Sequence, residues 1–156
     1  MEEYWPFRYN FLYMENVVTH FGQLDITCGW IFISLGITTG SILGLWSFAG
    51  PFPAPTGHRD YADLPRRLNR LAHIACFMLP LITITYGNYI DQALLTDFQK
   101  MLGVYGMLVC MVGVPSFLFL ASFYLPFKYL EVIPVGAGTM SLYLMSWAHL
   151  KLLLHV

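Results

Sequence analysis

The stretch from residue 64 to residue 91 constrains the fold of this chain most strongly. A collar of three arginines, Arg66, Arg67 and Arg70, leads directly into a long apolar run that contains one imidazole, His73. An ionisable side chain inside a membrane-length apolar segment is costly unless another group pairs with it, so it marks a candidate functional site. We therefore expect a membrane-spanning helix here, with His73 as its candidate site residue.

The composition is that of an integral membrane protein. Hydrophobic residues make up 57% of the 156 residues and charged residues only 11%, against roughly 25% charged in an ordinary soluble domain. A helix needs about 20 apolar residues to cross a hydrocarbon core. Segments of this length lie at residues 24–49, 68–90, 101–125 and 132–155. The sequence thus predicts an all-α integral membrane protein whose transmembrane domain, residues 24–156, is a bundle of four transmembrane helices.

The first 23 residues differ from the apolar segments that follow them. Aromatic side chains alternate there with polar and charged ones, as at Trp5, Phe7 and Tyr9. Amphipathic rings of this kind prefer the headgroup layer of a membrane. We expect residues 1–23 to form an interfacial arm that lies on the membrane or on a partner subunit.

The distribution of positive charge predicts how the bundle is oriented. Arg59 and the collar residues Arg66, Arg67 and Arg70 give the loop side, residues 50–67, most of the basic charge. Positive residues accumulate on the cytoplasmic side of membrane proteins. We expect this loop to be cytoplasmic and both termini to lie on the opposite side of an energy-transducing or plasma membrane. The collar arginines are also expected to contact anionic lipid headgroups.

Each predicted span carries a face of small or polar residues. In the first span, Gly36, Gly40 and Gly44 form a GxxxGxxxG pattern, which lets another backbone or a flat cofactor approach closely. Gly40 is therefore a candidate cofactor-binding position, with helix packing as the simpler role. The faces of the later spans are Asn69, His73, Cys76, Pro80, Thr83 and Gly87; Gly103, Gly106, Cys110 and Gly113; and Thr139, Tyr143, Ser146 and His149.

Two intramembrane histidines, His73 and His149, are candidate ligands of a b-type haem iron. Neutral imidazole is a common haem ligand, and helical bundles present such ligands from facing helices. From the predicted spans, the two differ in depth by roughly 20 Å at the helical rise of about 1.5 Å per residue, so they are not expected to bind the same haem. The alternatives that stay open are Met78, Met140 or another subunit as partner of His73, and His20, Met101, Met107 or another subunit as partner of His149. A hydrogen-bonding role between helices also stays open for each histidine.

A quinone site is the second chemical interpretation. Asp63, Arg66, Arg70 and His73 would form a polar corner at the headgroup level, beside apolar helices. These residue types suit a quinone head, and a lipid anchor formed by the arginines is the simpler alternative. Arg70 and His73 are therefore candidate cofactor-binding residues.

Several classes of function are disfavoured by what the sequence lacks. No Asp or Glu is expected in the middle of a span, so a proton-coupled transporter would lack its usual relay. The few Lys and Arg do not form a nucleic-acid surface. No common catalytic motif is found, and the three cysteines, each inside an apolar run, are expected to serve packing.

A small four-helix protein with intramembrane histidines and glycine faces is similar in architecture to the membrane-anchor subunits of respiratory and photosynthetic electron-transfer complexes. The similarity implies a non-catalytic accessory subunit that stabilises the assembly, next to other integral membrane subunits, with haem b or quinone as candidate cofactors. The alternatives are a purely structural or assembly subunit without cofactor and, less favoured, a small transporter.

Overall fold

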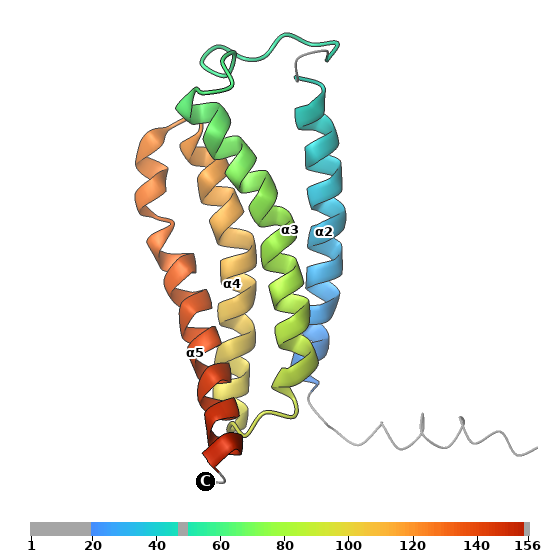
Figure 1. Ribbon diagram of the computed structural model, residues 1–156, viewed down its shortest axis with the longest axis vertical. Coiled ribbons are helices and arrows are strands. Elements are labelled where there is room, and N and C mark those ends of the chain that lie inside the picture. The colour runs from blue at the N-terminus through green and yellow to red at the C-terminus, as the bar shows by residue number, and fades with distance from the viewer. Residues whose placement is uncertain (1–19, 47–49, 155–156) are drawn as a thin grey trace, which may run out of the picture.

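The computed structural model describes residues 20–46 and 50–154, and this part of the chain forms a bundle of helices without a strand (Figure 1). The elements are α2 (Phe21–Gly44), α3 (Leu64–Ile90), α4 (Asp97–Ala121), the short 3-10 helix η1 (Leu125–Tyr129) and α5 (Val132–Leu154). The prediction of an all-helical bundle is thus confirmed. By length and composition, α2, α3 and α4 are able to cross a membrane, while the crossing by α5 stays a prediction.

The helices α2, α3 and α4 begin three or four residues earlier than the apolar pattern predicted, because local signals extend them into polar sequence, whereas α5 begins at the predicted residue. α4 starts after Thr96, whose hydroxyl accepts the Gln99 backbone N–H while the Gln99 side chain accepts the Thr96 N–H, a capping box. α3 starts at Leu64 with Pro65 in its first turn, where the missing N–H of proline is not needed. α2 starts at Phe21, so it takes in the end of the predicted arm. Residues 1–19 of that arm lie outside the described residues.

Consecutive helices of the bundle lie side by side. α2 packs on α3, α3 on α4 and α4 on α5, and α4 also contacts α2. The loop between α2 and α3 lies at one end of the bundle, whereas the start of α2 and the end of α5 lie at the other (Figure 1). The side of the membrane on which the loop lies stays a prediction.

Close contact between α2 and α3 depends on glycines spaced along α2. Gly22 meets the backbone of Gly87, Gly36 meets Cys76, and Gly40 meets the ring of His73. A Cβ at any of these positions would press on α3, which is how small residues let two helices approach closely. Gly44, the last glycine of the predicted pattern, has nothing within 4 Å of where a Cβ would lie, so the packing face ends at Gly40.

The glycines of α4 serve two different neighbours. Gly103 meets the Tyr86 hydroxyl of α3, whereas Gly106 meets Ser141 and Gly113 meets Pro134, both on α5. Sequence spacing had placed these glycines on one face, but that face is wide enough to touch two helices. The apolar core beside it consists of Tyr86, Ile90, Val104 and Met107.

Candidate functional site

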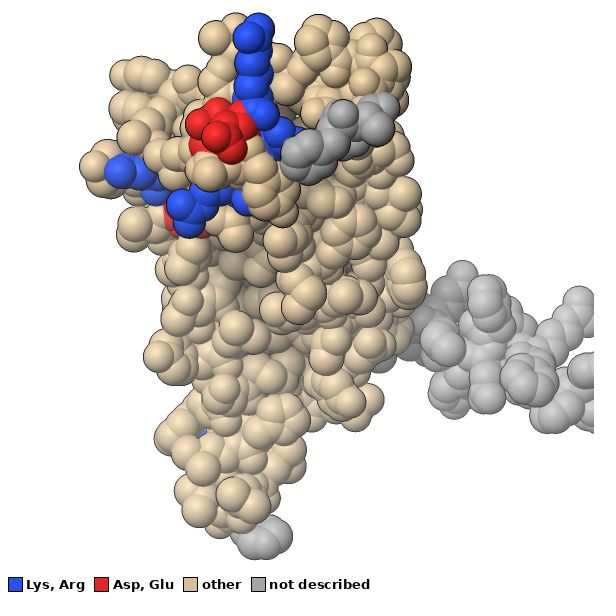
Figure 2. All heavy atoms as spheres, turned by 45° about the horizontal axis from the view of Figure 1, so that its top comes forward, with Lys and Arg blue, Asp and Glu red and all other residues tan. Residues whose placement is uncertain are grey.

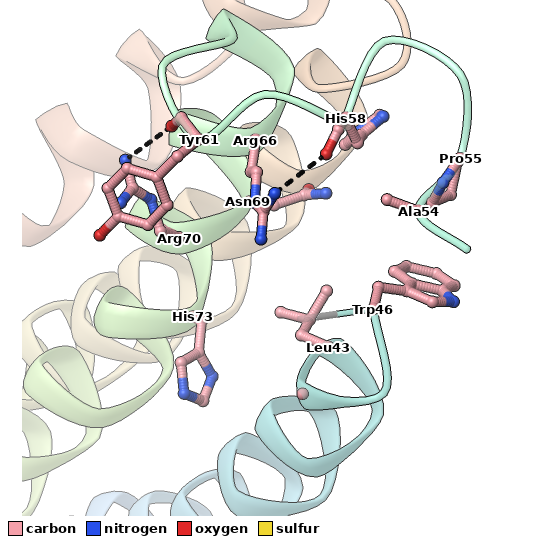
Figure 3. Close-up of a pocket in the computed structure, with 11 residues that line it drawn as sticks. Leu43, Trp46, Ala54, Pro55, His58, Tyr61, Arg66, Asn69, Arg70 and His73 are labelled. Carbon is pink, nitrogen blue, oxygen red and sulfur yellow. Dashed lines mark hydrogen bonds between the residues drawn. The ribbon is translucent and has the colours of Figure 1, made fainter. Parts of the chain in front are cut away.

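Two adjoining cavities lie at the loop end of the bundle, between α2 and α3. The first has a volume of about 270 Å³ and is closed by the 50–63 loop (Figure 3). The second has a volume of about 390 Å³ and extends between α2, α3 and α4. Leu43, Trp46, Asn69 and His73 line both cavities. Both cavities are lined mainly by apolar surface, but the first also carries the polar side chains of Arg66, Asn69, Arg70 and His73, so we call it the polar compartment and the second the apolar compartment.

His73 stands where the two cavities meet. Its ring packs against Gly40 on α2 and makes an edge-on contact with Phe77, with ring centroids 5.0 Å apart. Its Nδ1 is buried and finds no hydrogen-bond partner among the described residues. Buried polar atoms of folded proteins are nearly always paired, so an unpaired one calls for an explanation.

Three further side chains of the first cavity share this property, one of them Arg70, whose Nε is buried without a partner among the described residues. Asn69 is buried one helical turn before His73, and its Oδ1 has no hydrogen-bond partner in the described part of the chain. His58, from the loop, is also buried, and the same holds for its Nε2, while its ring lies against Phe123 with centroids 5.4 Å apart. Sequence reasoning had not chosen Asn69 or His58 as site residues. The position of Asn69 four residues before His73 was the available signal, and none existed for His58.

The arginine collar holds the loop over the first cavity. Arg66 donates hydrogen bonds to the backbone carbonyls of His58 and Arg59. Arg70 donates to the Tyr61 carbonyl and stacks on the Tyr61 ring, 3.7 Å from its centroid (Figure 3). Arg66 and Arg70 both line the cavity. Their contact with lipid headgroups, like that of Arg67, stays a prediction.

Charged side chains on the visible face gather at this end of the molecule, whereas the body below them is uncharged (Figure 2). The loop residues Arg59, Asp60 and Asp63 lie here, and Asp63 accepts the Asp60 backbone N–H. A charged rim on an apolar body suits a protein whose loop end reaches water or headgroups.

His149 lies far from this site. It is exposed on α5, and its ring is 6.4 Å from that of Tyr89, near the opposite end of α3. Tyr89 follows His73 by sixteen residues on α3, which corresponds to about 24 Å along a helix. The structure therefore does not bring His73 and His149 together.

The methionines considered as second ligands do not complete a site either. Met78 and Met140 are exposed and line neither of the cavities at His73. Met107 is buried in the core, whereas His20 and Met101 line another shallow cavity near the start of α2. Among residues 20–46 and 50–154 there is no group of three or more His, Cys, Asp and Glu that could hold a metal ion. Ligation of haem iron by His73 or His149 stays a prediction.

One buried acid adds to the sequence-based picture of the spans. We expected no carboxylate in the middle of a span, and Asp25 is the second residue of the predicted span 24–49. α2 begins at Phe21, so Asp25 is its fifth residue, and none of its surface is exposed. Sequence reasoning had not chosen Asp25 as a site residue, because its burial depends on the contact of α2 with α3.

The fold and the cavities thus define an all-helical bundle, with three helices long enough for a membrane and a polar cavity that opens into an apolar groove. Comparison with protein families, with curated proteins and with solved structures finds no match to this chain. The function is therefore argued from the site alone.

Proposed function

We propose that this chain is an accessory integral membrane subunit of a multisubunit electron-transfer complex, and that it holds the head of a quinone at His73. The observation that carries the proposal is the continuity of the two cavities. The compartment under the loop offers buried polar atoms without partners, on Asn69 and His73, and the compartment beyond is largely apolar. An amphiphile with a small polar head and a long apolar tail fits this arrangement.

Hydrogen-bonding chemistry suits a quinone or its reduced quinol. A quinone carbonyl accepts hydrogen bonds, and His73, in the tautomer that carries a proton on Nδ1, can donate one. Asn69 Oδ1 is an acceptor, so it would take a hydrogen bond from a hydroxyl of the quinol. The arginines beside them donate to loop carbonyls, and Arg70 Nε is a further buried donor without a partner among the described residues.

The apolar compartment suits an isoprenoid tail. Phe32, Leu35 and Ile42 of α2 and Phe119 of α4 line it, with Trp46 at its junction with the polar compartment. Binding pockets are commonly apolar with a few polar groups that fix the orientation of the ligand. A tail placed here would leave along the side of the bundle, where lipid is expected.

The role as a subunit of a larger assembly is supported by α5. The stripe of Thr139, Tyr143, Ser146 and His149 is exposed over its whole length, and Tyr143, in the middle of the helix, is 72% exposed. If α5 is the fourth transmembrane helix, this stripe would place polar groups in the lipid, unless a neighbouring helix covers it. A b-type haem at His73 or His149 would likewise need its second ligand from another subunit.

Tryptophan fluorescence tests the quinone proposal. Trp46 lines both cavities, and a bound quinone ring quenches nearby tryptophan emission. Titration of the purified chain in nanodiscs with a short-chain ubiquinone should give saturable quenching that is lost in Trp46→Phe. In His73→Ala and Asn69→Ala the dissociation constant should rise about tenfold each, equivalent to about 1.4 kcal/mol.

His149→Ala is the matched control, since it removes an imidazole at the other end of the bundle. Equal affinity of all variants for the quinone would contradict the proposal. Displacement of the quinone by anionic phospholipid at equal concentration would identify the cavity as a lipid site. Silent histidine variants, with assembly of partner subunits still lost in Gly40→Leu, would favour the alternative of a structural subunit without cofactor.

A further inference from the structure

A second cluster of buried polar groups lies near the opposite end of the bundle, away from the cavities at His73. Asp25 of α2 and Thr83 of α3 have no exposed surface, and Tyr86 of α3 is 4% exposed. Both carboxylate oxygens of Asp25, the Thr83 hydroxyl and the Tyr86 hydroxyl have no hydrogen-bond partner among the described residues. This cluster is independent of the proposed quinone site.

The backbone contact between α2 and α3 brings the cluster together. The Cβ of Asp25 lies 3.0 Å from the position that a Cβ of Gly87 would take. Thr83, Tyr86 and Gly87 share one face of α3 at spacings of three and four residues. Asp25 is also within range of an electrostatic interaction with the Tyr86 phenol, and that hydroxyl lies against Gly103 of α4.

The hydroxyl of Thr83 makes no hydrogen bond among the described residues, unlike most other Ser and Thr hydroxyls in the helices of this bundle. Serine and threonine hydroxyls in helices commonly donate to the carbonyl four residues earlier. Here this bond is made by Ser34, Thr38, Ser41, Thr85, Ser116, Ser141 and Ser146. Thr83 does not make it, so its hydroxyl is available to the cluster.

An ionised carboxylate is strongly disfavoured in such surroundings. A buried charge needs a counter-ion or several hydrogen bonds, and without them it is neutralised instead. The nearby groups are engaged elsewhere: the Asp91 carboxylate accepts the Gly22 N–H, and Lys100 donates to the Asp91 carbonyl. Other titratable groups at this end of the surrounding helices are Cys28 of α2, Tyr86 and Tyr89 of α3, and Asp97 and Tyr105 of α4, together with His20 before α2.

We infer that Asp25 is a proton-binding site, in which the buried carboxyl group carries a proton at neutral pH and lies close enough to the Tyr86 phenol to sense its dipole. Uptake converts the carboxylate and one proton into the neutral acid. Bulk solvent at this end of the bundle would supply the proton. A divalent metal ion is a poorer occupant, because such ions prefer six or more oxygen ligands and the cluster has fewer.

Infrared spectroscopy of the full chain in nanodiscs tests this inference. At pH 7 we expect one carbonyl stretching band of a protonated carboxyl group, which shifts in heavy water and is lost in Asp25→Asn. Tyr86→Phe should retain the band and shift it, because the dipole of the nearby phenol hydroxyl is removed. Asp97→Asn is the matched control: Asp97 is exposed at the start of α4, so this variant should leave the band unchanged.

The outcomes separate the occupants of the site. No protonated carboxyl band at pH 7, or a band that Asp25→Asn retains, overturns the inference. Loss of the band on adding sodium chloride, but not choline chloride, overturns it as well and identifies a site for a monovalent cation. Should Asp25→Asn fail to fold, the Tyr86→Phe variant decides: a band that it leaves unchanged belongs to another carboxyl group and overturns the inference.

Discussion

The imidazole of His73 on α3 packs against Gly40 on α2 so closely that a Cβ at position 40 would overlap the ring. The glycine thus provides the space in which His73 stands at the junction of the two cavities. The sequence spacing predicted that Gly40 serves helix packing or the approach of a cofactor. In the structure it leaves room for the His73 ring on the opposite helix.

This contact predicts the effect of Gly40→Ala. The added methyl group would push the ring into the cavity, so quinone affinity should fall about tenfold, or about 1.4 kcal/mol. The ring is the mobile end of a side chain, so the melting temperature should change little. Gly136→Ala, on α5, has open space around its Cβ and lines neither cavity at His73, so it serves as the control. Equal affinity of the two variants in the fluorescence titration would contradict the prediction.

Gly87→Ala should act on stability instead. A Cβ there would meet the backbone carbonyl of Gly22, which cannot move without shifting α2. We expect a loss of about 1–3 kcal/mol in the free energy of unfolding, as for other overpacked interiors. Thermal unfolding in detergent measures it. Gly136→Ala is the control, since nothing lies within 4 Å of its Cβ position; a loss of the same size there would exclude the contact as the cause.

Haem ligation is tested by the two histidines separately. If either binds a haem iron with a ligand from a partner subunit, His73→Ala or His149→Ala should lower the b-haem content of the purified assembly. Redox difference spectra of the assembly measure that content. Because the two imidazoles lie near opposite ends of the bundle, they cannot bind the same haem. Each variant should therefore lose only the haem that its own histidine binds. Unchanged absorbance in both variants would remove the haem hypothesis and leave the quinone proposal intact.

The polar stripe on α5 predicts a contact with another membrane subunit. Tyr143→Phe removes one exposed hydroxyl, and hydrogen bonds between membrane helices contribute roughly 0.6 kcal/mol each on average. We expect a two- to threefold loss in the yield of the assembly purified in mild detergent. Adding Thr139→Val and Ser146→Ala should deepen the loss. Tyr129→Phe, on exposed η1, should have no effect, and an equal effect would argue against a specific contact.

The connection between η1 and α5 predicts a dependence of stability on pH. Partial burial raises the pKa of Glu131 above its ordinary value. The folded state therefore binds the proton more tightly than the unfolded state, and the resulting stabilisation is present at low pH and lost as the pH rises through the folded-state pKa. As the pH rises through the folded-state pKa of Glu131, the melting temperature should fall less in Glu131→Gln than in the wild type. The exposed residue Asp97, changed to Asn, provides the comparison; parallel curves for the wild type and Glu131→Gln would contradict the prediction.

The differences between predicted and observed helix boundaries show what the sequence can predict about the helices. The apolar lengths located each of the helices, because hydropathy is a local property that needs no knowledge of neighbours. The starts were misplaced by up to four residues where caps and polar first turns extend a helix beyond its apolar part, as at Thr96 and Leu64. The start of α2 three residues before the predicted one also moves Asp25 from the margin of the helix into its second turn.

The sequence by itself determined the helical class, the apolar character, the glycine faces and the separation in depth of His73 and His149, since composition and helical rise are sufficient for these. Only the tertiary structure decided what each face meets. It placed His58 of the loop on the same cavity as Asn69 and His73, buried Asp25 beside Gly87, and turned Tyr143 outward. The physical reason is that helical periodicity shows which residues share a face, whereas the partner of that face depends on packing between segments distant in the chain.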